Sequence, residues 1–195
     1  MKEHYYSQEQ HSKENPRVIK TQIFGNTIEL ETDAGVFSPK KVDKGSEVLI
    51  LNAKINGGDR VLDLGCGYGA VGITLAKEYN IELVMTEVNK RAVRLARRNV
   101  KKNNVNAKIL QGDGFEKVQG EFDTILLNPP QSAGKKLCEN LIEQSKDFLK
   151  KGGKLQVVAR KNKGGKVLSE FMQSVFGNLE VLAKSGGFWV YKSVK

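Results

Sequence analysis

An Asn-Pro-Pro turn is the most informative group of residues in the sequence. Asn128, Pro129 and Pro130 directly follow the apolar run FDTILL, at a point where a strand would end. Proline fixes φ and has no amide donor, so two successive prolines give a rigid turn that presents carbonyl acceptors. The Asn128 side chain adds another oxygen acceptor. These acceptors can hold an amine in a pyramidal geometry, with its lone pair aimed at a reaction partner, and we therefore predict that the three residues are catalytic.

A glycine-rich turn follows the apolar run RVLDL, and it comprises Gly65, Gly67 and Gly69 before Ala70. Glycines between a strand and a helix let a cofactor approach the backbone closely, although they can also serve only a tight turn. The same spacing fits the dinucleotide fingerprint, so the glycines alone do not separate a nicotinamide cofactor from S-adenosylmethionine (SAM). Asp63 favours SAM, because a carboxylate there would repel dinucleotide phosphates but would attract the ammonium group of an amino acid.

Two further carboxylates follow the next apolar runs. Glu87 ends the run IELVMTE, where it can accept hydrogen bonds from both hydroxyls of a ribose, a group that both cofactors contain. Asp113 lies in the segment QGDG after the third run and is placed to accept from an adenine amine. A turn or helix-cap role for Asp113 fits its position equally well.

These residues need a sheet whose strand ends meet at one edge. Apolar runs without strict alternation are separated by amphipathic helical patterns, which predicts a parallel sheet covered on both faces, a doubly wound α/β domain. The final two runs, 179–183 and 188–194, are joined by a segment too short for a crossover helix, so we expect an antiparallel last strand. The other expected strands are 60–65, 81–87, 107–110, 122–128 and 154–159, and the expected helices are about 70–79, 89–103, 135–150 and 166–176.

The N-terminal part has a different pattern. Residues 1–17 are polar and are expected to form a flexible tail. Residues 18–32 contain two β-rich runs around Gly25-Asn26 and predict a hairpin, and residues 45–55 have helical spacing. The expected organisation is one domain over residues 18–195, with an N-terminal flank at 18–57 and a Rossmann-like core at 58–195.

Length and charge restrict the class of protein. The chain has 195 residues, which is one domain, and a formal net charge of +10, which makes nucleic acid the leading partner over a merely solvated basic surface. Two cysteines without a metal-binding pattern, and no apolar run of 18 residues, predict a cytoplasmic protein without a membrane segment. Both histidines, His4 and His11, lie in the tail, so a histidine-dependent site is disfavoured and no metal is expected.

The chemistry-bearing segments together resemble a known family. The pattern Asp63-x-Gly65-x-Gly67-x-Gly69, with Glu87, Asp113, Asn128-Pro129-Pro130 and the upstream Gly35-Val36-Phe37-Ser38, resembles the small-domain class I methyltransferases. That family includes the ribosomal RNA small-subunit guanine-N2 methyltransferases, and the resemblance covers roughly residues 18–195 and is to single-domain, archaeal-type members. It implies a seven-stranded class I methyltransferase fold, SAM as methyl donor and an exocyclic base amine as acceptor, with guanine N2 in 16S ribosomal RNA indicated. The implied cofactor-binding residues are Asp63, Gly65, Cys66, Gly67, Gly69, Glu87, Val88, Asp113, Gly114 and Asn128.

One departure from the family pattern concerns the base. Gln131 stands where amino-methyltransferases commonly carry an aromatic residue that stacks on the target base, so Phe37, Phe115 or Phe188 would have to supply that ring. Basic segments at 90–102 and 160–166 are candidate RNA contacts. The predicted substrate-binding residues are Phe37, Lys41, Lys44, Gln131, Lys135, Lys161 and Lys163.

Competing interpretations remain open at this stage. Asn-Pro-Pro sites also serve other amine and amide acceptors, such as those of tRNA, DNA adenine N6 or a protein glutamine. A different class is a NAD-dependent oxidoreductase, which Gly65, Gly67 and Ala70 favour and Asp63 disfavours. A catalytically silent RNA-binding module is a third class. The sequence leaves open whether the protein is a monomer or a homodimer.

Overall fold

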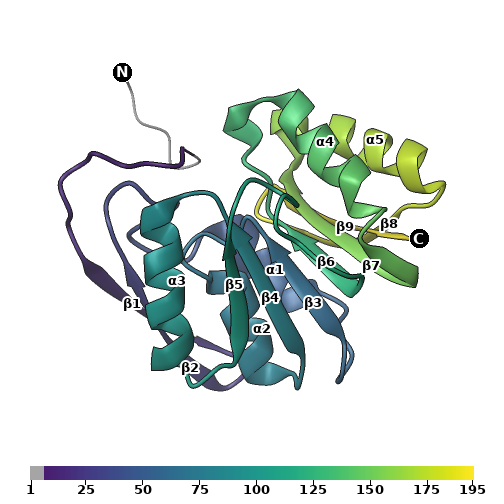
Figure 1. Ribbon diagram of the computed structural model, residues 1–195. Helices are drawn as coiled ribbons and strands as arrows, with labels where there is room; N and C mark the ends of the chain where they lie inside the picture. Colours follow the sequence, from purple (N-terminus) through teal and green to yellow (C-terminus); the bar gives the residue numbers. More distant parts are fainter. Residues whose placement is uncertain (1–6) are drawn as a thin grey trace.

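The computed structural model describes residues 7–195, which form a mixed seven-stranded sheet covered by helices and a separate two-stranded hairpin (Figure 1). Strands β3 to β7 run parallel, and β9 is antiparallel to both of its neighbours, β7 and β8. This confirms the doubly wound fold with an antiparallel last strand. The sheet order is β5 (Ala107–Gln111), β4 (Glu82–Glu87), β3 (Arg60–Leu64), β6 (Phe122–Leu127), β7 (Leu149–Arg160), β9 (Phe188–Val194) and β8 (Glu180–Ser185).

Both faces of the sheet are buried. Helices α1 (Lys44–Asn52), α2 (Ala70–Glu78) and α3 (Lys90–Lys102) cover one face, and α4 (Lys135–Ser145) and α5 (Lys166–Phe176) lie together on the other (Figure 1). Alternate residues of one strand therefore enter different cores: Leu62 and Leu64 pack with α4 and α5, whereas Val61 packs with α1 and α2. Burial on both sides is the reason that the strands read as continuous apolar runs.

The fourth helix is shorter than its sequence pattern indicates. The pattern predicts a helix over 135–150, but α4 ends at Ser145. Leu149 instead pairs with Phe122 and opens β7, and both side chains are fully buried. Gly152, with φ 78°, lies where the register between β6 and β7 shifts, and this conformation favours glycine. The strong apolar character of Leu149 thus serves a strand and not the last turn of a helix.

The expected N-terminal hairpin consists of β1 (Arg17–Ile23) and β2 (Asn26–Thr32). Two asparagines one helical turn apart on α3 attach it to the core. Asn99 accepts from the Glu31 amide and donates to the Glu31 carbonyl, and Asn103 does the same with Glu29. The spacing of the two asparagines matches the spacing of Glu29 and Glu31. Alternate residues of a strand are about 6.8 Å apart, and residues i and i+4 of a helix are about 6 Å apart.

Residues 7–16 of the expected tail follow α3 in the structure, and residues 1–6, which include His4, lie outside the described residues. The Lys90 amide donates to the carbonyl of Gln8. The buried guanidinium of Arg91 donates to the carbonyls of Ser12 and Ala34, at 2.7 and 2.6 Å. Arg91 therefore joins this segment, the end of the hairpin and α3 at one point.

We expect Asn99→Ala to lower the free energy of unfolding by about 2–3 kcal/mol. The substitution leaves the backbone amide and carbonyl of Glu31 and the carbonyl of Tyr68 without their hydrogen-bond partner. Urea denaturation measures this change. Arg97→Ala, an exposed position on the same helix, is the matched control and should stay within about 0.5 kcal/mol of wild type. Equal stability of the two variants would contradict the proposed attachment.

Candidate active site

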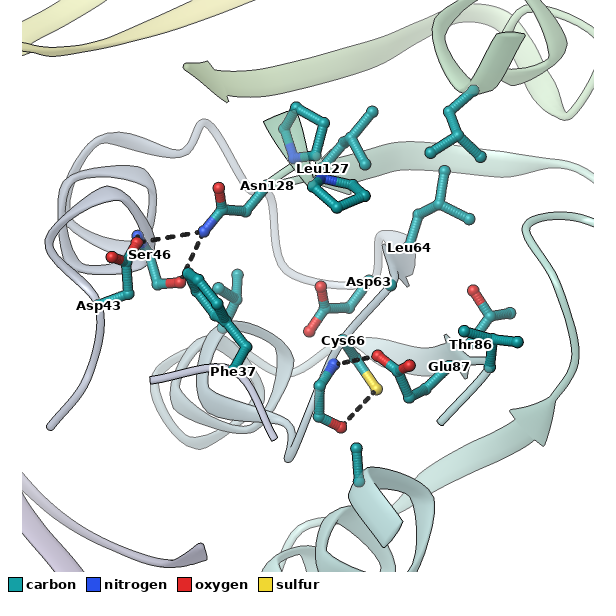
Figure 2. A pocket seen from close by; sticks show the side chains of 18 of the residues that line it. Phe37, Asp43, Ser46, Asp63, Leu64, Cys66, Thr86, Glu87, Leu127 and Asn128 are labelled. Atoms are coloured by element: carbon teal, nitrogen blue, oxygen red, sulfur yellow. Dashed lines mark hydrogen bonds between the residues drawn. The ribbon is translucent and has the colours of Figure 1, made fainter. Parts of the chain in front are cut away.

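A cavity of about 290 Å³ opens at the carboxyl ends of β3, β4 and β6, between the glycine turn, the start of α1 and the Asn-Pro-Pro turn (Figure 2). This is the edge at which open α/β sheets bind ligands. The structure brings all ten predicted cofactor-binding residues and the three predicted catalytic residues to its lining except Gly69, which precedes α2. Predicted residues from four segments that are distant in sequence thus surround one space.

The Asn128 side chain has a defined orientation. Its Nδ2 donates to Ser46 Oγ at 3.0 Å and to Asp43 Oδ2 at 3.4 Å, as the dashed lines in Figure 2 show. The opposite amide orientation would place Oδ1 against the Asp43 carboxylate, where no proton is available. Among the described residues no hydrogen bond uses Asn128 Oδ1. The acceptor oxygen that the sequence assigns to an amine is therefore the free end of a fixed amide.

Asp43 holds this arrangement through two roles. It is the N-cap of α1, and its Oδ2 accepts from the Ser46 amide at 3.1 Å as well as from Asn128. Gly45 makes room for it, since a Cβ there would lie 2.9 Å from Asp43 Oδ2 and 3.0 Å from the Phe188 ring. Sequence reasoning missed Asp43 and Ser46, although an aspartate before a helical run is an N-cap signal.

The glycine turn leaves open space for a ligand. Gly65 and Gly67 have φ of 70° and 58°, and a Cβ added at either would meet no atom within 4 Å. The Gly67 amide donates to Glu87 Oε2 at 2.8 Å, and the Asn89 amide donates to Glu87 Oε1 at 2.8 Å. Each carboxylate oxygen keeps further acceptor capacity. Glu87 thus fixes the turn and can still accept from the hydroxyls of a ribose.

Asp63 is a buried carboxylate at the bottom of the cavity, with only 4% of its surface exposed. Burial raises the pKa of Asp63 to about 7, an effect that the Gly72 amide opposes by donating to Oδ2 at 2.8 Å and that the charge of Glu87 reinforces. Burial likewise raises the pKa of Glu87, against the amides of Asn89 and Gly67. Among residues 7–195 only backbone amides bind these two adjacent buried carboxylates, so the site favours a cation.

The other predicted cofactor residues differ in burial. Cys66 is buried, and desolvation raises the pKa of its thiol well above the usual value, so its contribution is its shape and backbone. Val88 and Gly114 are half-buried and Asp113 is exposed, at the opposite side of the cavity from Asn128. Thr86 Oγ1, beside them, is buried and has no hydrogen-bond partner among the described residues.

Of the three aromatic residues that could stack on a base, two line the cavity. Phe37 and Phe188 both contribute to its wall. Phe115 is buried in the core, stacked on Phe148 with ring centroids 4.5 Å apart. Tyr68, which sequence reasoning did not single out, donates to the Ser38 carbonyl at 3.3 Å and so holds the Phe37 loop at the cavity.

The predicted substrate-binding polar residues occupy the rim. Gln131 lines the cavity, but its amide is used locally: Oε1 accepts from the Arg160 amide and Nε2 donates to the Lys163 carbonyl. It therefore fixes the loop after β7. The predicted lysines lie outside the lining: Lys44 pairs with Glu47, Lys135 pairs with Glu139, Lys161 lies over the Trp189 ring, and Lys41 and Lys163 are exposed.

Most cations of α3 have partners within the molecule. Acidic residues of the 7–16 segment and of β2 reach four of its cations, and Arg91 is buried against carbonyl oxygens. The ion pairs are Lys90–Glu9, Arg94–Glu14, Arg98–Glu31 and Lys102–Glu31. The segment at 160–166 differs, because Arg160, Lys161 and Lys163 have no carboxylate partner among residues 7–195. Three cations without a carboxylate partner among the described residues thus lie at or next to the rim of the cavity.

No helix between residues 7 and 195 is long and apolar enough to cross a membrane. Within the same residues no three histidine, cysteine, aspartate or glutamate side chains gather as metal ligands would.

The pKa of Asp63 has a consequence for stability. A folded pKa near 7 against 3.8 means that Asp63 favours folding below about pH 4 and that this contribution is lost as pH rises to 7. Relative to wild type, Asp63→Asn should therefore gain roughly 3 kcal/mol of stability between pH 4.5 and 7.5, at about 1.4 kcal/mol per unit. Denaturant unfolding across this range measures the difference. Asp123→Asn, at a half-exposed site, should show a flat difference there, and a flat difference for Asp63→Asn would contradict the raised pKa.

Comparisons with known proteins identify the family. A family model described as methyltransferase small domain matches residues 27–192. The uncharacterized protein YbxB of Bacillus subtilis (strain 168) is 37% identical over 202 residues, with 100% of both chains covered. Ribosomal RNA small subunit methyltransferase C of Haemophilus influenzae (strain PittGG) is 36% identical over 168 residues, which are 83% of this chain and 49% of that protein.

A solved structure agrees with the sequence relatives. The T. thermophilus 16S rRNA N2 G1207 methyltransferase, in complex with AdoMet and guanosine, has a TM-score of 0.81 and 26% identity, covering 92% of this chain and 50% of that one. The chain thus spans about half the length of the two ribosomal RNA methyltransferases that it resembles. With the family model covering most of the sequence and the class I fold shared, the chain belongs to the methyltransferase small domain family.

Proposed function

We propose that the protein is a SAM-dependent methyltransferase that acts on an exocyclic amine of an RNA base, namely guanine N2 in small-subunit ribosomal RNA. The observation that carries this proposal is the fixed Asn128 amide, whose oxygen faces no partner at the rim of a cavity built on a glycine turn. The similar T. thermophilus enzyme, a 16S rRNA N2 G1207 methyltransferase, supports the choice of base.

The cavity suits SAM, the AdoMet of the T. thermophilus complex. Asp63 offers a buried carboxylate to the ammonium group, and Glu87 offers acceptor oxygens to the ribose hydroxyls. The open space at Gly65 and Gly67 admits the ligand close to the backbone. Asp113 is proposed to accept from the adenine amine. When bound, SAM supplies an activated methyl group.

Asn128 would orient the acceptor amine. Its Oδ1 and the Pro129 carbonyl accept N–H groups, and this holds the nitrogen pyramidal with the lone pair directed into the cavity. The Pro129 oxygen already accepts from the Gln131 amide at 2.8 Å and keeps one lone pair. Transfer of the methyl group leaves the acceptor nitrogen positively charged, and this cation is acidic enough to lose a proton to water, so orientation and electrostatics supply the catalysis. Phe37 and Phe188 are the rings that could hold the base, since both line the cavity.

The family and the charge of the chain bear on the two competing classes of function, an oxidoreductase and a methyltransferase with another acceptor. Membership of the methyltransferase small domain family removes the support for a NAD-dependent oxidoreductase. Acceptors in tRNA, DNA or protein would use the same Asn128 geometry, and the net charge of +10 favours a nucleic acid over a protein.

Orientation of the amide can be tested on α1. We expect Asn128→Ala to lower kcat by about 100-fold or more, because it removes an acceptor that acts in the transition state. Ser46→Ala and Asp43→Ser should each lower kcat by about 10-fold or more, because the Asn128 amide can then rotate. The serine at position 43 retains a helix cap, so thermal stability should stay close to wild type. Glu47→Gln, in the same helical turn, is the matched control. SAM affinity, measured by calorimetry, should change little in the variants at positions 43, 46 and 47. Near-wild-type turnover of Asn128→Ala with SAM bound would refute the role.

The acceptor is tested by transfer of labelled methyl groups from SAM to total RNA, purified small ribosomal subunits, DNA and protein. We expect label in RNA and N2-methylguanosine after nuclease digestion and mass spectrometry.

Asp63→Asn should be inactive and should lose the rise in melting temperature that SAM produces, because the ammonium group loses its carboxylate. Label in DNA or protein alone would overturn the acceptor and leave the methyltransferase assignment intact.

A further inference from the structure

Two lysines lie over an indole ring beside the mouth of the cavity. Trp189, the second residue of β9, is half-buried. The Nζ atoms of Lys161 and Lys184 are 4.7 and 4.2 Å from its ring centroid. Both lysines are exposed, and neither pairs with a carboxylate among the described residues. The ring therefore carries two cations whose charge is not neutralised by the protein.

The sheet topology places this group at the same edge as Asn128. Strands β6 and β7 are parallel and end at this edge, and the antiparallel β9 begins there. The residues preceding Lys161 and Trp189 are Arg160 and Phe188, which pair across β7 and β9 and line the cavity. Because side chains alternate along a strand, Trp189 lies on the opposite face of the sheet from Phe188, against the core of α4 and α5, one residue from the cavity lining. Because adjacent strands are about 4.8 Å apart, β9 is about 10 Å from β6, a distance that the nucleotides next to a target base can cross.

Hydrogen bonds hold the group in position relative to the cavity. The Lys161 amide donates to the Gly187 carbonyl at 3.0 Å, which ties the loop after β7 to the β8–β9 turn. Gln131, which follows the Asn-Pro-Pro turn, binds the Arg160 amide and the Lys163 carbonyl. The distance between the catalytic turn and the indole is thus set by the backbone.

We propose that Trp189, Lys161 and Lys184 form a binding surface for single-stranded RNA that takes a nucleotide flanking the target base. The base stacks on the indole face that a lysine now covers, and the two ammonium groups move to the adjacent phosphates. Aromatic rings with neighbouring cations bind single strands in this way, whereas bases within a duplex are already stacked. The inference rests on the proposed function, because it takes RNA as the substrate.

The charge distribution favours this surface over α3. The basic residues of α3 are the more conspicuous cluster in the sequence, but Glu9, Glu14 and Glu31 pair with four of its seven cations. A phosphate at α3 would have to displace these carboxylates. At Lys161 and Lys184 it displaces only cation–π contacts, and no paired carboxylate among the described residues repels it.

Trp189 is the single tryptophan of the chain, so its fluorescence reports on this surface directly. With the site saturated by S-adenosylhomocysteine, we expect a short single-stranded oligoribonucleotide to quench the fluorescence saturably, at the same midpoint as the anisotropy of a labelled copy. A duplex of the same sequence should bind more weakly and leave the fluorescence nearly unchanged.

Variants separate stacking from charge. Trp189→Ala should weaken single-strand binding by roughly 5- to 100-fold, and Trp189→Phe should restore part of the loss, because one stacked base contributes about that much. Lys161→Ala and Lys184→Ala should each reduce the slope of log K against log salt by about 0.7. Lys151→Ala, an exposed position at the opposite end of β7, and Arg97→Ala on α3 are matched controls that should leave the slope unchanged. An unchanged thermal shift by SAM shows that each variant folds.

The binding and methylation experiments test the RNA-binding surface and the proposed function separately. Methylation of RNA by wild type with unaltered RNA binding in the Trp189 and lysine variants would overturn the surface and leave the proposed function standing. RNA binding that follows Trp189 and both lysines, without methyl transfer to RNA, would support the surface and remove the acceptor. Saturable binding without a change in Trp189 fluorescence, or no RNA binding at all, would falsify the inference.

Discussion

The structure around the cavity depends on the burial of two carboxylates at neighbouring strand ends. Asp63 and Glu87 have few cationic neighbours, and backbone amides satisfy them instead: Gly72 for Asp63, and Gly67 and Asn89 for Glu87. Those amides belong to the glycine turn and to the starts of α2 and α3. The conformation of the glycine turn and the positions at which α2 and α3 begin are thus determined by the hydrogen bonds that the two buried carboxylates require.

This arrangement costs stability in the absence of a ligand, because the raised pKa of Asp63 records an unfavourable charge. A ligand that carries an ammonium group would offset the cost on binding. Strain of this kind is common at functional sites, where the groups that serve a ligand are seldom those that best stabilise the fold.

The N-terminal flank is part of the candidate active site. It supplies Phe37, Asp43 and Ser46, and the last two fix the orientation of Asn128. The flank is held by side chains of α3, namely Arg91, Asn99 and Asn103. Several side chains of α3 therefore serve to hold the N-terminal flank. Arg160, at the rim of the cavity, has no carboxylate partner among the described residues and can attract a polyanion.

The sequence by itself determined the fold class, the antiparallel last strand, the hairpin and the place of the Asn-Pro-Pro and glycine turns. Apolar periodicity, glycine and proline act locally, so a linear pattern reports them. Only the tertiary structure decided that Leu149 opens a strand, since this depends on its pairing with Phe122. It also decided that Phe115 belongs to the core while Phe37 and Phe188 line the cavity. The partners of Asn128 and of the α3 cations come from segments up to 85 residues away in sequence, and contacts at such separation leave no local pattern to read.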